Sequence, residues 1–465
     1  MAGCILIIDS VATNRIVLKV KLQAAHYRVF TCAALVEART QIADAPPDLI
    51  LLDMTADGQE AREFVRTLRA NFQTSEIPVI GLGHFDRPED RLAAFQAGMA
   101  DILPKPVSDI RLLARIRSLL RVSDANAELR LRDDTSRALG FAEAAPIFED
   151  PGRIVMVSDA VATSLPFANR LSDASGCDIR TIDAETALVP KGVETPPDLI
   201  VIDASASSCD ADQARIFRLI ADLRGRSESR HCSQLVILPE DCPETDAMAL
   251  DLGANDVVPA TVSLAEIALR ARALVRQKHR LDQLRDTVQS GLKAAITDPL
   301  TGIYNRRYAI PHVGGLLQRA RNTGRDFAIL ALDIDHFKRI NDTWGHAVGD
   351  KILIGVTQRI KDNLRAGDLV ARVGGEEFLV ALPEVTFEQA KGAAERLRRT
   401  IQAGPFFVDK AATPISVTLS IGVAIGTQTA CLAETVDQIL ERADAALYIA
   451  KAAGRNTIEI SQSAA

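Results

Sequence analysis

The run most able to do chemistry is Gly374-Gly-Glu-Glu-Phe378, which lies between two β-rich runs. A Gly-Gly pair in that position predicts a tight hairpin whose primed turn needs positive φ, which glycine adopts without steric cost. The adjacent carboxylates of Glu376 and Glu377 repel each other and add nothing to a core, so we expect a cation beside them. A solvated acidic hairpin tip is the alternative that this pentapeptide alone leaves open.

A further acidic position is expected beside this hairpin. Residues 327–335 form an apolar run that reads as a strand and ends in acidic residues. On an antiparallel sheet this strand can lie next to the hairpin, which would bring Asp333, Glu376 and Glu377 together. Mg²⁺ prefers carboxylate oxygens and substrate phosphates, so three carboxylates at strand ends suit a site with one or two Mg²⁺ ions. Such sites carry out in-line phosphoryl or nucleotidyl transfer.

Two pairs of polar residues have the chemistry of nucleotide binding. Lys451 and Arg455 fall one helical turn apart near the end of an amphipathic helix predicted over 436–453. We therefore expect both on one face, within reach of terminal phosphates. Asn341 and Asp350 supply the acceptor and donor groups that a guanine edge needs. Taken singly, each of these residues is more simply a solvated surface side chain.

The pattern of the C-terminal region indicates the elements that must position these residues. Residues 327–335 and 414–423 read as strands before and after the Gly-Gly hairpin, and helical patterns accompany them. Helices around a mostly antiparallel sheet give an α+β, ferredoxin-like or palm-like domain. A connector over 272–297 has apolar residues at helical spacing, which fits a surface helix and a short parallel coiled coil equally.

The N-terminal half contains an internal repeat. Residues 45–53, Ala-Pro-Pro-Asp-Leu-Ile-Leu-Leu-Asp, recur at 195–203 as Thr-Pro-Pro-Asp-Leu-Ile-Val-Ile-Asp. In each copy short apolar runs alternate with helical patterns, which indicates a doubly wound parallel sheet. Ligands bind such folds at the carboxyl ends of the strands. At those ends the sequence places Asp9, Asp53, Asp159 and Asp203.

Length and composition narrow the function further. The 465 residues suggest about three domains. A net charge of −7 argues against a general nucleic-acid binder. The seven cysteines are scattered without a Cys-x-x-Cys pair, so neither a disulfide framework nor a zinc site is expected. No apolar run fits a signal peptide or approaches the roughly 18 residues of a spanning helix. We expect a cytoplasmic protein without a transmembrane segment.

Seven motifs in order make residues 298–459 resemble a GGDEF-family diguanylate cyclase domain. The motifs are Asp298-Pro-Leu-Thr-Gly-Ile-Tyr-Asn-Arg-Arg307, Asp333-Ile-Asp-His-Phe-Lys338, Asn341-Asp342, Gly345-His-Ala-Val-Gly-Asp350, Gly374-Gly-Glu-Glu-Phe378, Ser420-Ile-Gly422 and Ala450-Lys-Ala-Ala-Gly-Arg-Asn456. The resemblance implies condensation of two GTP into cyclic di-GMP with release of two pyrophosphates. Because each domain binds one GTP, it also implies a homodimer in which two domains face each other.

The resemblance implies that the acidic cluster carries the metal and transfer chemistry. Asp333 and Glu376 would hold Mg²⁺, with Mn²⁺ as the alternative, aided by the backbone carbonyl of Ile334. Glu377 would help with the metal or activate the 3′-hydroxyl, and these two roles stay open. Lys338 would stabilise phosphate charge in the transition state.

The same resemblance implies which residues bind the nucleotide. Asn341 and Asp350 would read guanine, and Lys451 and Arg455 would grip the β- and γ-phosphates.

A further match is Arg365-Ala-Gly-Asp368, shortly before the hairpin. In the family, an Arg-x-x-Asp at this position forms a product-binding inhibitory site, with arginine on phosphate and guanine and aspartate on the base. Arg396 on a neighbouring helix would support it. The alternative is a weak exposed ion pair.

Residues 1–120 and 152–276 each resemble a response-regulator receiver domain. In the first copy Asp53 matches the phosphoacceptor, Asp9 one acidic-pocket residue and Lys105 the family lysine. A carboxylate nucleophile needs a metal ion to screen the incoming phosphoryl group and a lysine to hold its oxygens.

Both copies depart from the receiver pattern. In the first copy Ser10 stands where a second pocket acid is usual and Gly83 where a hydroxyl residue is usual. Phosphorylation of Asp53 and an inert strand-end aspartate therefore both stay open. The second copy keeps Asp203 but has Ala260 at the lysine position and Pro239 at the hydroxyl position. It is therefore interpreted as a packing or dimerisation adaptor.

The predicted architecture is α/β, with two doubly wound parallel-sheet receiver domains followed by an α+β ferredoxin-like or palm-like cyclase domain. Its order resembles the PleD type of cyclase and implies a cognate histidine kinase or phosphotransfer protein upstream. The predicted parts are a receiver at 1–122, a helical linker at 123–150, a degenerate receiver at 151–277, a connecting helix at 278–297 and the cyclase domain at 298–465.

Two other functions compete with an active, product-inhibited cyclase. A catalytically silent cyclic di-GMP receptor or scaffold would use only Arg365 and Asp368, and the intact carboxylates and Lys338 argue against it. Another purine nucleotide cyclase on a similar palm is disfavoured by Asn341 and Asp350 at guanine-reading positions.

Overall fold

The computed structural model describes residues 3–55, 58–85, 87–138, 151–189, 196–206, 210–239, 242–407, 414–427 and 434–461. The chain forms two compact units, one up to Val288 and one from Gln289 onward. The first unit contains two five-stranded sheets and the second a six-stranded sheet. The end of the predicted linker, 139–150, lies outside the described residues.

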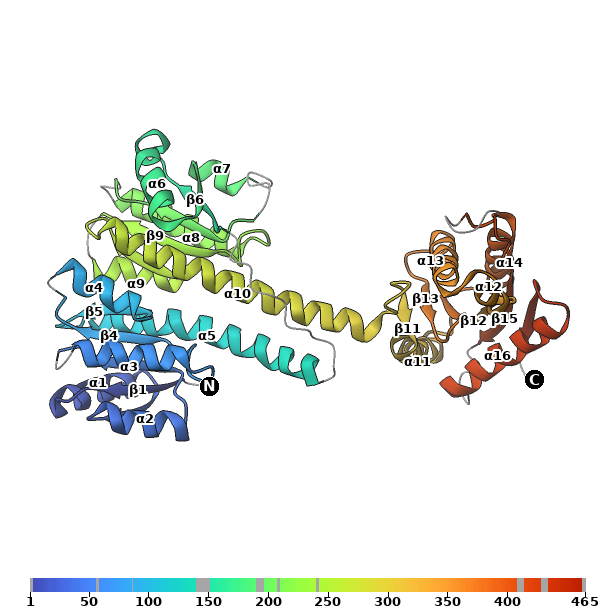
Figure 1. Cartoon of the computed structure of the whole chain (residues 1–465), viewed down its shortest axis with the longest axis horizontal. Coiled ribbons are helices and arrows are strands. Elements are labelled where there is room, and N and C mark those ends of the chain that lie inside the picture. Colours follow the sequence, from blue (N-terminus) through green and yellow to red (C-terminus); the bar gives the residue numbers. More distant parts are fainter. Residues whose placement is uncertain are drawn as a thin grey trace. The chain divides into compact units, whose positions relative to one another are not determined.

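The first sheet is parallel throughout, with strand order β2-β1-β3-β4-β5. Alternate residues of its central strands pack against α1 and α5 on one face and against α2, α3 and α4 on the other (Figure 1). An all-parallel sheet needs both faces covered, which explains the continuous apolar runs. The elements are β1 (Cys4–Ile8), α1 (Ala12–Ala24), β2 (Arg28–Cys32), α2 (Leu35–Asp44), β3 (Leu49–Asp53), α3 (Gly58–Ala70), β4 (Val79–Gly83), α4 (Pro88–Gln96), β5 (Asp101–Pro104) and α5 (Asp109–Ala138).

The second sheet repeats this order as β7-β6-β8-β9-β10 and is also parallel. Helices α6 and α10 cover one face, and α8 and α9 the other. Its elements are β6 (Arg153–Val157), α6 (Val161–Ser175), β7 (Asp178–Ile182), α7 (Ala184–Leu188), β8 (Leu199–Asp203), α8 (Asp210–Gly225), β9 (Ser233–Leu238), α9 (Pro243–Leu252), β10 (Asp256–Pro259) and α10 (Leu264–Ile296). The prediction of two doubly wound parallel-sheet domains is confirmed.

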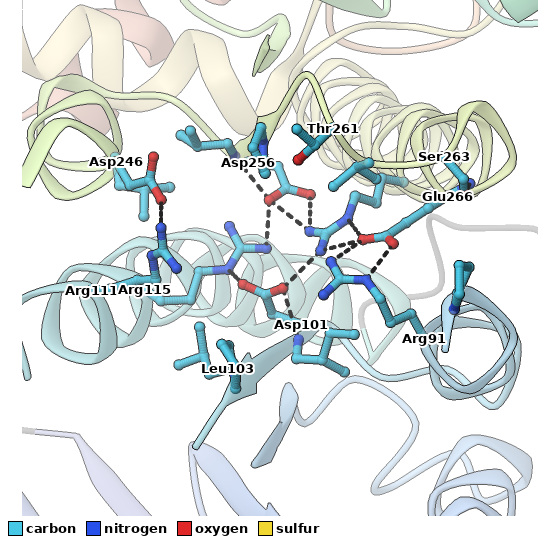
Figure 2. A pocket seen from close by; sticks show the side chains of 18 residues that line it. Arg91, Asp101, Leu103, Arg111, Arg115, Asp246, Asp256, Thr261, Ser263 and Glu266 are labelled. Atoms are coloured by element: carbon cyan, nitrogen blue, oxygen red, sulfur yellow. Dashed lines mark hydrogen bonds and ion pairs between the residues drawn. The ribbon is translucent and has the colours of Figure 1, made fainter. Parts of the chain in front are cut away.

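These two domains of the first unit meet through buried charged residues (Figure 2). Asp101 begins β5 and Asp256 begins β10, while Arg115 lies on α5 and Arg270 on α10. Arg115 lies 3.0 Å from Asp256, and Arg270 lies 3.1 Å from Asp101. Each arginine therefore crosses to the aspartate of the other domain.

The crossed pairs make this contact reciprocal, because the four residues hold matching positions in the two domains. Burial alone would raise the pKa of Asp101, but Arg115 and Arg270 hold it below its ordinary value. Removing one member of such a buried pair leaves an uncompensated charge and costs about 3–5 kcal/mol. The two domains are thus held by specific charge pairing as well as by apolar burial.

The third sheet belongs to the second unit and has the order β11-β13-β14-β12-β15-β16. Its four central strands are antiparallel, and their order β15-β12-β14-β13, with α13 and α14 as crossovers, is the ferredoxin-like arrangement. The short β11 and β16 add parallel edges. The elements are β11 (Tyr304–Asn305), α11 (Arg306–Thr323), β12 (Phe327–Ile334), α12 (Phe337–Trp344), α13 (His346–Asp362), β13 (Leu369–Arg372), β14 (Glu377–Pro383), α14 (Phe387–Ala403), β15 (Leu419–Gly426), α16 (Val436–Ala452) and β16 (Ile458–Ser461).

Helix α16 lies directly on this sheet. A Cβ added to Gly422 on β15 would clash with the backbone of Ala443 and Leu447 on α16, so only glycine allows this approach. The same face of the sheet carries Phe327, Ile329 and Ala331 of β12, which pack with α11 and α16. Side chains alternate along a strand, so the next residue on the α16 face is Asp333. The predicted α+β ferredoxin-like domain is confirmed.

The Gly-Gly connection differs from the predicted tight turn. Strand β13 ends at Arg372 and β14 begins at Glu377, so four residues join the strands. Neither Gly374 nor Gly375 is among the glycines with positive φ. Gly374 instead leaves room for a side chain, because a Cβ there would clash with the carboxylate of Glu377. The prediction of a two-residue primed turn is wrong.

The long helix α10 contains the predicted connector, and the choice between surface helix and coiled coil stays open. Among the described helices, none combines the length and apolar character needed to cross a bilayer.

Candidate active site

The end of β12 brings two of the three predicted carboxylates, those of Asp333 and Glu377, onto neighbouring strands. Asp333 is the register partner of Glu377 on β14. The backbone N–H of Ile334 donates to the carbonyl of Glu376 at 3.3 Å, which ties the strand end to the hairpin. All eight residues of β12 are buried, so the strand is a rigid support for the carboxylate at its end.

Lys451 reaches this strand end from α16. Its Nζ lies 2.6 Å from Asp333 Oδ2, and the Asp333 side chain is 8% exposed against 33% for the lysine. Both groups lie on the face of β12 that α16 covers. The lysine thus places one positive charge against the acidic strand end.

The electrostatics of the site favour added positive charge. Burial raises the pKa of Asp333 above its ordinary value, Lys451 opposes the rise, and Glu377 and Asp335 add to it. The pKa of Glu376 is also raised, by burial first and then by Asp333. Carboxylates whose pKa is raised in this way are stabilised as anions when a further cation approaches.

The donor set fits Mg²⁺ chemically, because it offers carboxylates and the carbonyl of Ile334. Within the described part of the chain, however, no three His, Cys, Asp or Glu side chains converge closely enough to hold a metal ion. The predicted three-carboxylate cluster is therefore not preassembled. Mg²⁺ usually binds through one or two carboxylates together with substrate phosphates rather than in a cage made only of protein groups.

The predicted transition-state and guanine residues lie on α12 and α13. Buried Phe337 packs the start of α12 into the core, which leaves the neighbouring Lys338 exposed. Asp350 on α13 is exposed as well. Asn341 is half-buried, and its Oδ1 is shielded from solvent without a hydrogen-bond partner. A buried acceptor without a partner is costly unless a ligand donates to it.

Arg455 does not share a helical face with Lys451, contrary to the sequence prediction. Helix α16 ends at Ala452, and Gly454 follows with φ of 113°. Arg455 lies beyond the helix in a left-handed conformation, with φ of 65°. Gly454 at positive φ turns the chain out of the helix, so Lys451 lies on α16 and Arg455 on the turn that follows it.

Sequence reasoning missed the residue that holds the Gly-Gly loop. Arg372 donates to the carbonyl of Gly375 at 2.6 and 3.0 Å and to both carboxylate oxygens of Asp298 at 3.1 and 3.2 Å. Burial alone would raise the pKa of Asp298, but hydrogen bonds from Thr301 and Arg372 hold it below its ordinary value. The position of Arg372, two residues before the glycines, was the only sequence signal for this role.

Asp444 on α16 was also missed. Burial and then the charge of Glu377 raise its pKa, while Arg306 and Lys451 lower it. Asp444 therefore adds another carboxylate to the electrostatics of the site. Its two-turn spacing from Lys451 along α16 is the signal that could have found it.

The predicted product-binding residues lie near one another on exposed surface. The N–H of Arg365 donates to Asp368 Oδ2 at 2.9 Å, which closes a turn before β13. Arg396 on α14 donates to the carbonyl of Asn363 at 3.0 Å, two residues before Arg365. Both arginine side chains are exposed.

The first receiver-like domain brings its three predicted residues together. Lys105 Nζ lies 2.6 Å from Asp53 and 3.2 Å from Asp9 at the carboxyl ends of the strands. Burial alone would raise the pKa of Asp53, but hydrogen bonds from Lys105 and Thr55 hold it below its ordinary value. Gly83 ends β4 and supplies no hydroxyl.

The second receiver-like domain replaces this cluster with hydroxyl groups. The strand register matches Ser158, not Asp159, to Asp9, and Ala260 follows β10 where Lys105 follows β5. Ser164 and Ser205 donate to Asp203 at 2.8 and 2.6 Å.

The register also corrects one predicted position in this domain. Leu238 pairs with Pro259 as Gly83 pairs with Pro104, so Leu238 rather than Pro239 holds the hydroxyl position. The sequence repeat alone did not determine this alignment.

Comparison with known proteins covers nearly the whole chain. Residues 295–457 match the family described as diguanylate cyclase, GGDEF domain, and residues 5–117 match the response regulator receiver domain. The chain is 34% identical over 463 residues to the response regulator PleD of Caulobacter vibrioides, covering 98% of this chain and 99% of that protein. It is 40% identical over 163 residues to the probable diguanylate cyclase DgcT of Escherichia coli, covering 35% of each.

Solved structures include a similar GGDEF domain. The coiled coil and GGDEF domain of DgcB from Caulobacter crescentus, in complex with c-di-GMP, has 28% identity and a TM-score of 0.37 over 41% of this chain and 98% of that one. The match to PleD extends over nearly the full length of both chains, and the two family matches fall on the first and the third sheet of this chain. The chain therefore belongs to the PleD-type response regulators with a GGDEF domain and is a diguanylate cyclase.

Proposed function

We propose that the chain condenses two GTP into cyclic di-GMP as a Mg²⁺-dependent homodimer, inhibited by its product and regulated through its first receiver domain. The observation that supports this most strongly is the meeting of Asp333, Glu377 and Lys451 at the end of β12. A strand end that combines surplus carboxylates with one lysine suits a cation together with a polyphosphate.

The proposed metal ligands are Asp333, Glu376 and the carbonyl of Ile334, with Mn²⁺ as the alternative ion. When bound, the ion would neutralise phosphate charge and polarise the α-phosphate.

The reaction forms a bond between the 3′-oxygen of one GTP and the α-phosphorus of another, and breaks the bond to pyrophosphate. Glu377 is exposed at the start of β14, where it would accept the 3′-hydroxyl proton or support the metal. Lys338 would balance the charge that develops on the phosphate. The Lys451 ammonium has three N–H donors, so it can hold Asp333 and a phosphate at once.

Base recognition is assigned to Asn341 and Asp350. The buried, unpartnered Oδ1 of Asn341 is an acceptor suited to a guanine N–H. The exposed carboxylate of Asp350 offers a second acceptor. Adenine carries an acceptor at N1 where guanine carries N1–H, so acceptors here favour guanine.

Dimerisation follows from the chemistry of the product. Each cyclase domain offers one acidic strand end, whereas cyclic di-GMP contains two equivalent phosphodiester links. Two copies of the chain must therefore face each other, each holding one GTP.

The direct test is incubation of the purified chain with GTP and Mg²⁺, with chromatography of the products. Cyclic di-GMP and pyrophosphate should appear in a ratio of one to two. Absence of product at protein concentrations where sedimentation shows a dimer would remove the proposal.

Product inhibition is assigned to Arg365, Asp368 and Arg396. The turn closed by Asp368 and the nearby Arg396 give an exposed surface with two guanidinium groups, which suits phosphate and guanine recognition. Changing Arg365 to Ala should raise the product concentration for half-inhibition about tenfold or more, since a bidentate charged contact is lost. Lys361→Ala, an exposed charge change on α13, is the matched control. Equal product inhibition of the two variants would contradict the inhibitory site assigned to Arg365.

A catalytically silent receptor for cyclic di-GMP is the second candidate, supported by the same Arg365 turn. It predicts tight product binding without turnover, which calorimetry and the product assay together distinguish.

Upstream, a histidine kinase or phosphotransfer protein is the proposed phosphoryl donor for Asp53. A cytoplasmic location fits the described cysteines, all of which are free.

A further inference from the structure

The turn that follows α16 has an unusual backbone. Gly454, Arg455 and Asn456 have φ values of 113°, 65° and 46°. Left-handed backbone is easy for glycine but strained for the two residues that carry a Cβ. Such a conformation persists only where surrounding contacts hold it, so the turn must be anchored from outside.

Two side chains anchor the turn at Asn456. Its backbone N–H donates to Asp335 Oδ2 at 3.0 Å. On the other side, Arg398 Nη1 donates to Asn456 Oδ1 at 2.9 Å and to its carbonyl at 3.3 Å. Both contacts fall on the residue directly after Arg455, and each joins the turn to a distant element.

Asp335 is firmly held at the end of β12. The residue is 5% exposed, and its Oδ1 and Oδ2 accept from Ser420 and Thr418 hydroxyl groups, each at 2.7 Å. Its N–H also donates to the carbonyl of Thr418 at 3.0 Å. These contacts join Asp335 to the β15 side of the sheet. Asn456 is therefore its link to the turn, and a carboxylate acceptor makes that link a strong one.

The end of β12 thus contacts both parts of the chain that carry the basic residues, Lys451 on α16 and Arg455 on the turn. Asp333 pairs directly with Lys451, while Asp335, two residues later, acts on Arg455 through the backbone of Asn456. The first contact places a side chain and the second fixes a backbone conformation.

We propose that Asp335 is the positioning residue of the phosphate-binding turn: its hydrogen bond to the Asn456 N–H holds residues 454–456 left-handed and so sets Arg455 for the terminal phosphates of GTP. This rests on the proposed role of Arg455 in binding those phosphates. Asp335 itself touches no nucleotide, and a buried aspartate with only a role in folding is the competing explanation.

The test measures nucleotide affinity of the full chain by calorimetry in Ca²⁺, and KM and kcat in Mg²⁺, for wild type, Asp335→Asn, Arg455→Ala and the double variant. Asp335→Asn keeps the size of the side chain but weakens its acceptor. GTP affinity should fall about tenfold, the loss typical of one charge-assisted hydrogen bond, mainly as a rise in KM. GMP affinity should not change, because GMP lacks the β- and γ-phosphates.

The double variant separates positioning from folding. Once Arg455 is absent, Asp335→Asn should cause little further loss of GTP affinity, since two residues that act through one contact are not additive. Additive losses, or an equal fall in GTP and GMP affinity, would overturn the positioning role. If Arg455→Ala alone leaves GTP affinity unchanged, the phosphate role proposed for Arg455 fails first, and the inference falls with it.

Ser420→Ala is the matched control, because it removes a hydrogen bond from the other oxygen of Asp335 and leaves the Asn456 contact intact. It should keep GTP affinity within about twofold of wild type. A loss equal to that of Asp335→Asn would indicate a general packing effect and overturn the inference.

A second measurement covers the case in which Asp335→Asn does not fold. In the unmodified chain, the Asn456 amide should exchange with solvent hydrogen slowly, because its acceptor is a buried carboxylate. Rapid exchange would show that the contact does not hold the turn.

Discussion

The cyclase site and the first receiver site use the same pair of residue types but stand in opposite electrostatic states. In each, a lysine Nζ lies 2.6 Å from a buried aspartate at a strand end, Lys451 from Asp333 and Lys105 from Asp53. The pKa of Asp333 lies above its ordinary value, because burial and nearby acids outweigh the lysine. The pKa of Asp53 lies below its ordinary value, because Lys105 and Thr55 outweigh burial.

The difference lies in how much donation each carboxylate receives. Asp53 accepts from Lys105 and from both the hydroxyl and the N–H of Thr55. Asp333 accepts from Lys451, but the nearby carboxylates of Glu377 and Asp335 raise its pKa, and the same lysine also acts on Glu376. A buried carboxylate anion is stabilised by hydrogen-bond donors and destabilised by other negative charges nearby. The charge of Asp53 in the receiver site is therefore already balanced by its donors, whereas the carboxylates of the cyclase site are stabilised by an added cation.

The largest expected effect is the loss of turnover when a carboxylate of the cyclase site is neutralised. Glu377→Gln removes one charge with little change in shape, and it should lower kcat at least about a hundredfold while the chain still dimerises. Product formation and sedimentation measure the two properties. Glu388→Gln, an exposed change on α14, should behave as wild type, and substantial turnover by Glu377→Gln would exclude both roles considered for this residue.

The next effect tests whether the satisfied receiver site still accepts a phosphoryl group. Beryllofluoride or acetyl phosphate should shift wild type toward dimer and raise its cyclase activity, and Asp53→Asn should abolish this response because it removes the nucleophile. Asp203→Asn is the matched control in the second domain, where Ser164 and Ser205, rather than a lysine, are the described donors to the aspartate. An unchanged response in Asp53→Asn, or no response in wild type, would mean that Asp53 is inert.

Opposite changes in stability would sharpen the comparison. In chelator at neutral pH, Asp333→Asn should raise the melting temperature of the cyclase unit by about 2 °C, because it removes a charge whose pKa folding raises. Asp53→Asn should lower the melting temperature of the receiver unit by a similar or larger amount, because removing a charge that is met by hydrogen-bond donors costs about 1–3 kcal/mol of unfolding free energy. Scanning calorimetry resolves both, and shifts of the same sign would contradict the assigned electrostatic states.

The smallest effect is the pH dependence of those shifts. Stability falls with rising pH where the folded state binds more protons, so the penalty at Asp333 is present at neutral pH and fades as pH drops through its raised pKa. The gain from Asp333→Asn should therefore shrink on acidification. The contribution of Asp53 is complete above its unfolded pKa, near 4, and is lost only as pH falls through its lowered folded pKa. A loss in Asp53→Asn that disappears well above pH 4 would contradict this.

Much of the fold was predictable because its signals are local. Continuous apolar runs ending in aspartate mark parallel strands, and the repeat of residues 45–53 at 195–203 marks two copies of one domain. The turn geometries were less predictable. The Gly-Gly pair suggested positive φ, yet the structure uses Gly374 to admit the Glu377 carboxylate and Arg372 to hold the loop. Sequence spacing does not reveal which side chain will need the vacant space.

By itself, the sequence determined the order of the three domains, the acidic strand ends and the seven motifs that identify the cyclase. Only the tertiary structure decided which of these residues meet. It paired Asp333 with Glu377 across β12 and β14, brought Lys451 onto Asp333 through the close approach of α16 at Gly422, and moved Arg455 off the helix onto a turn anchored by Asp335. Motifs and periodicities depend on neighbours in the chain, whereas strand register, helix packing and charge balance depend on contacts between segments far apart in it.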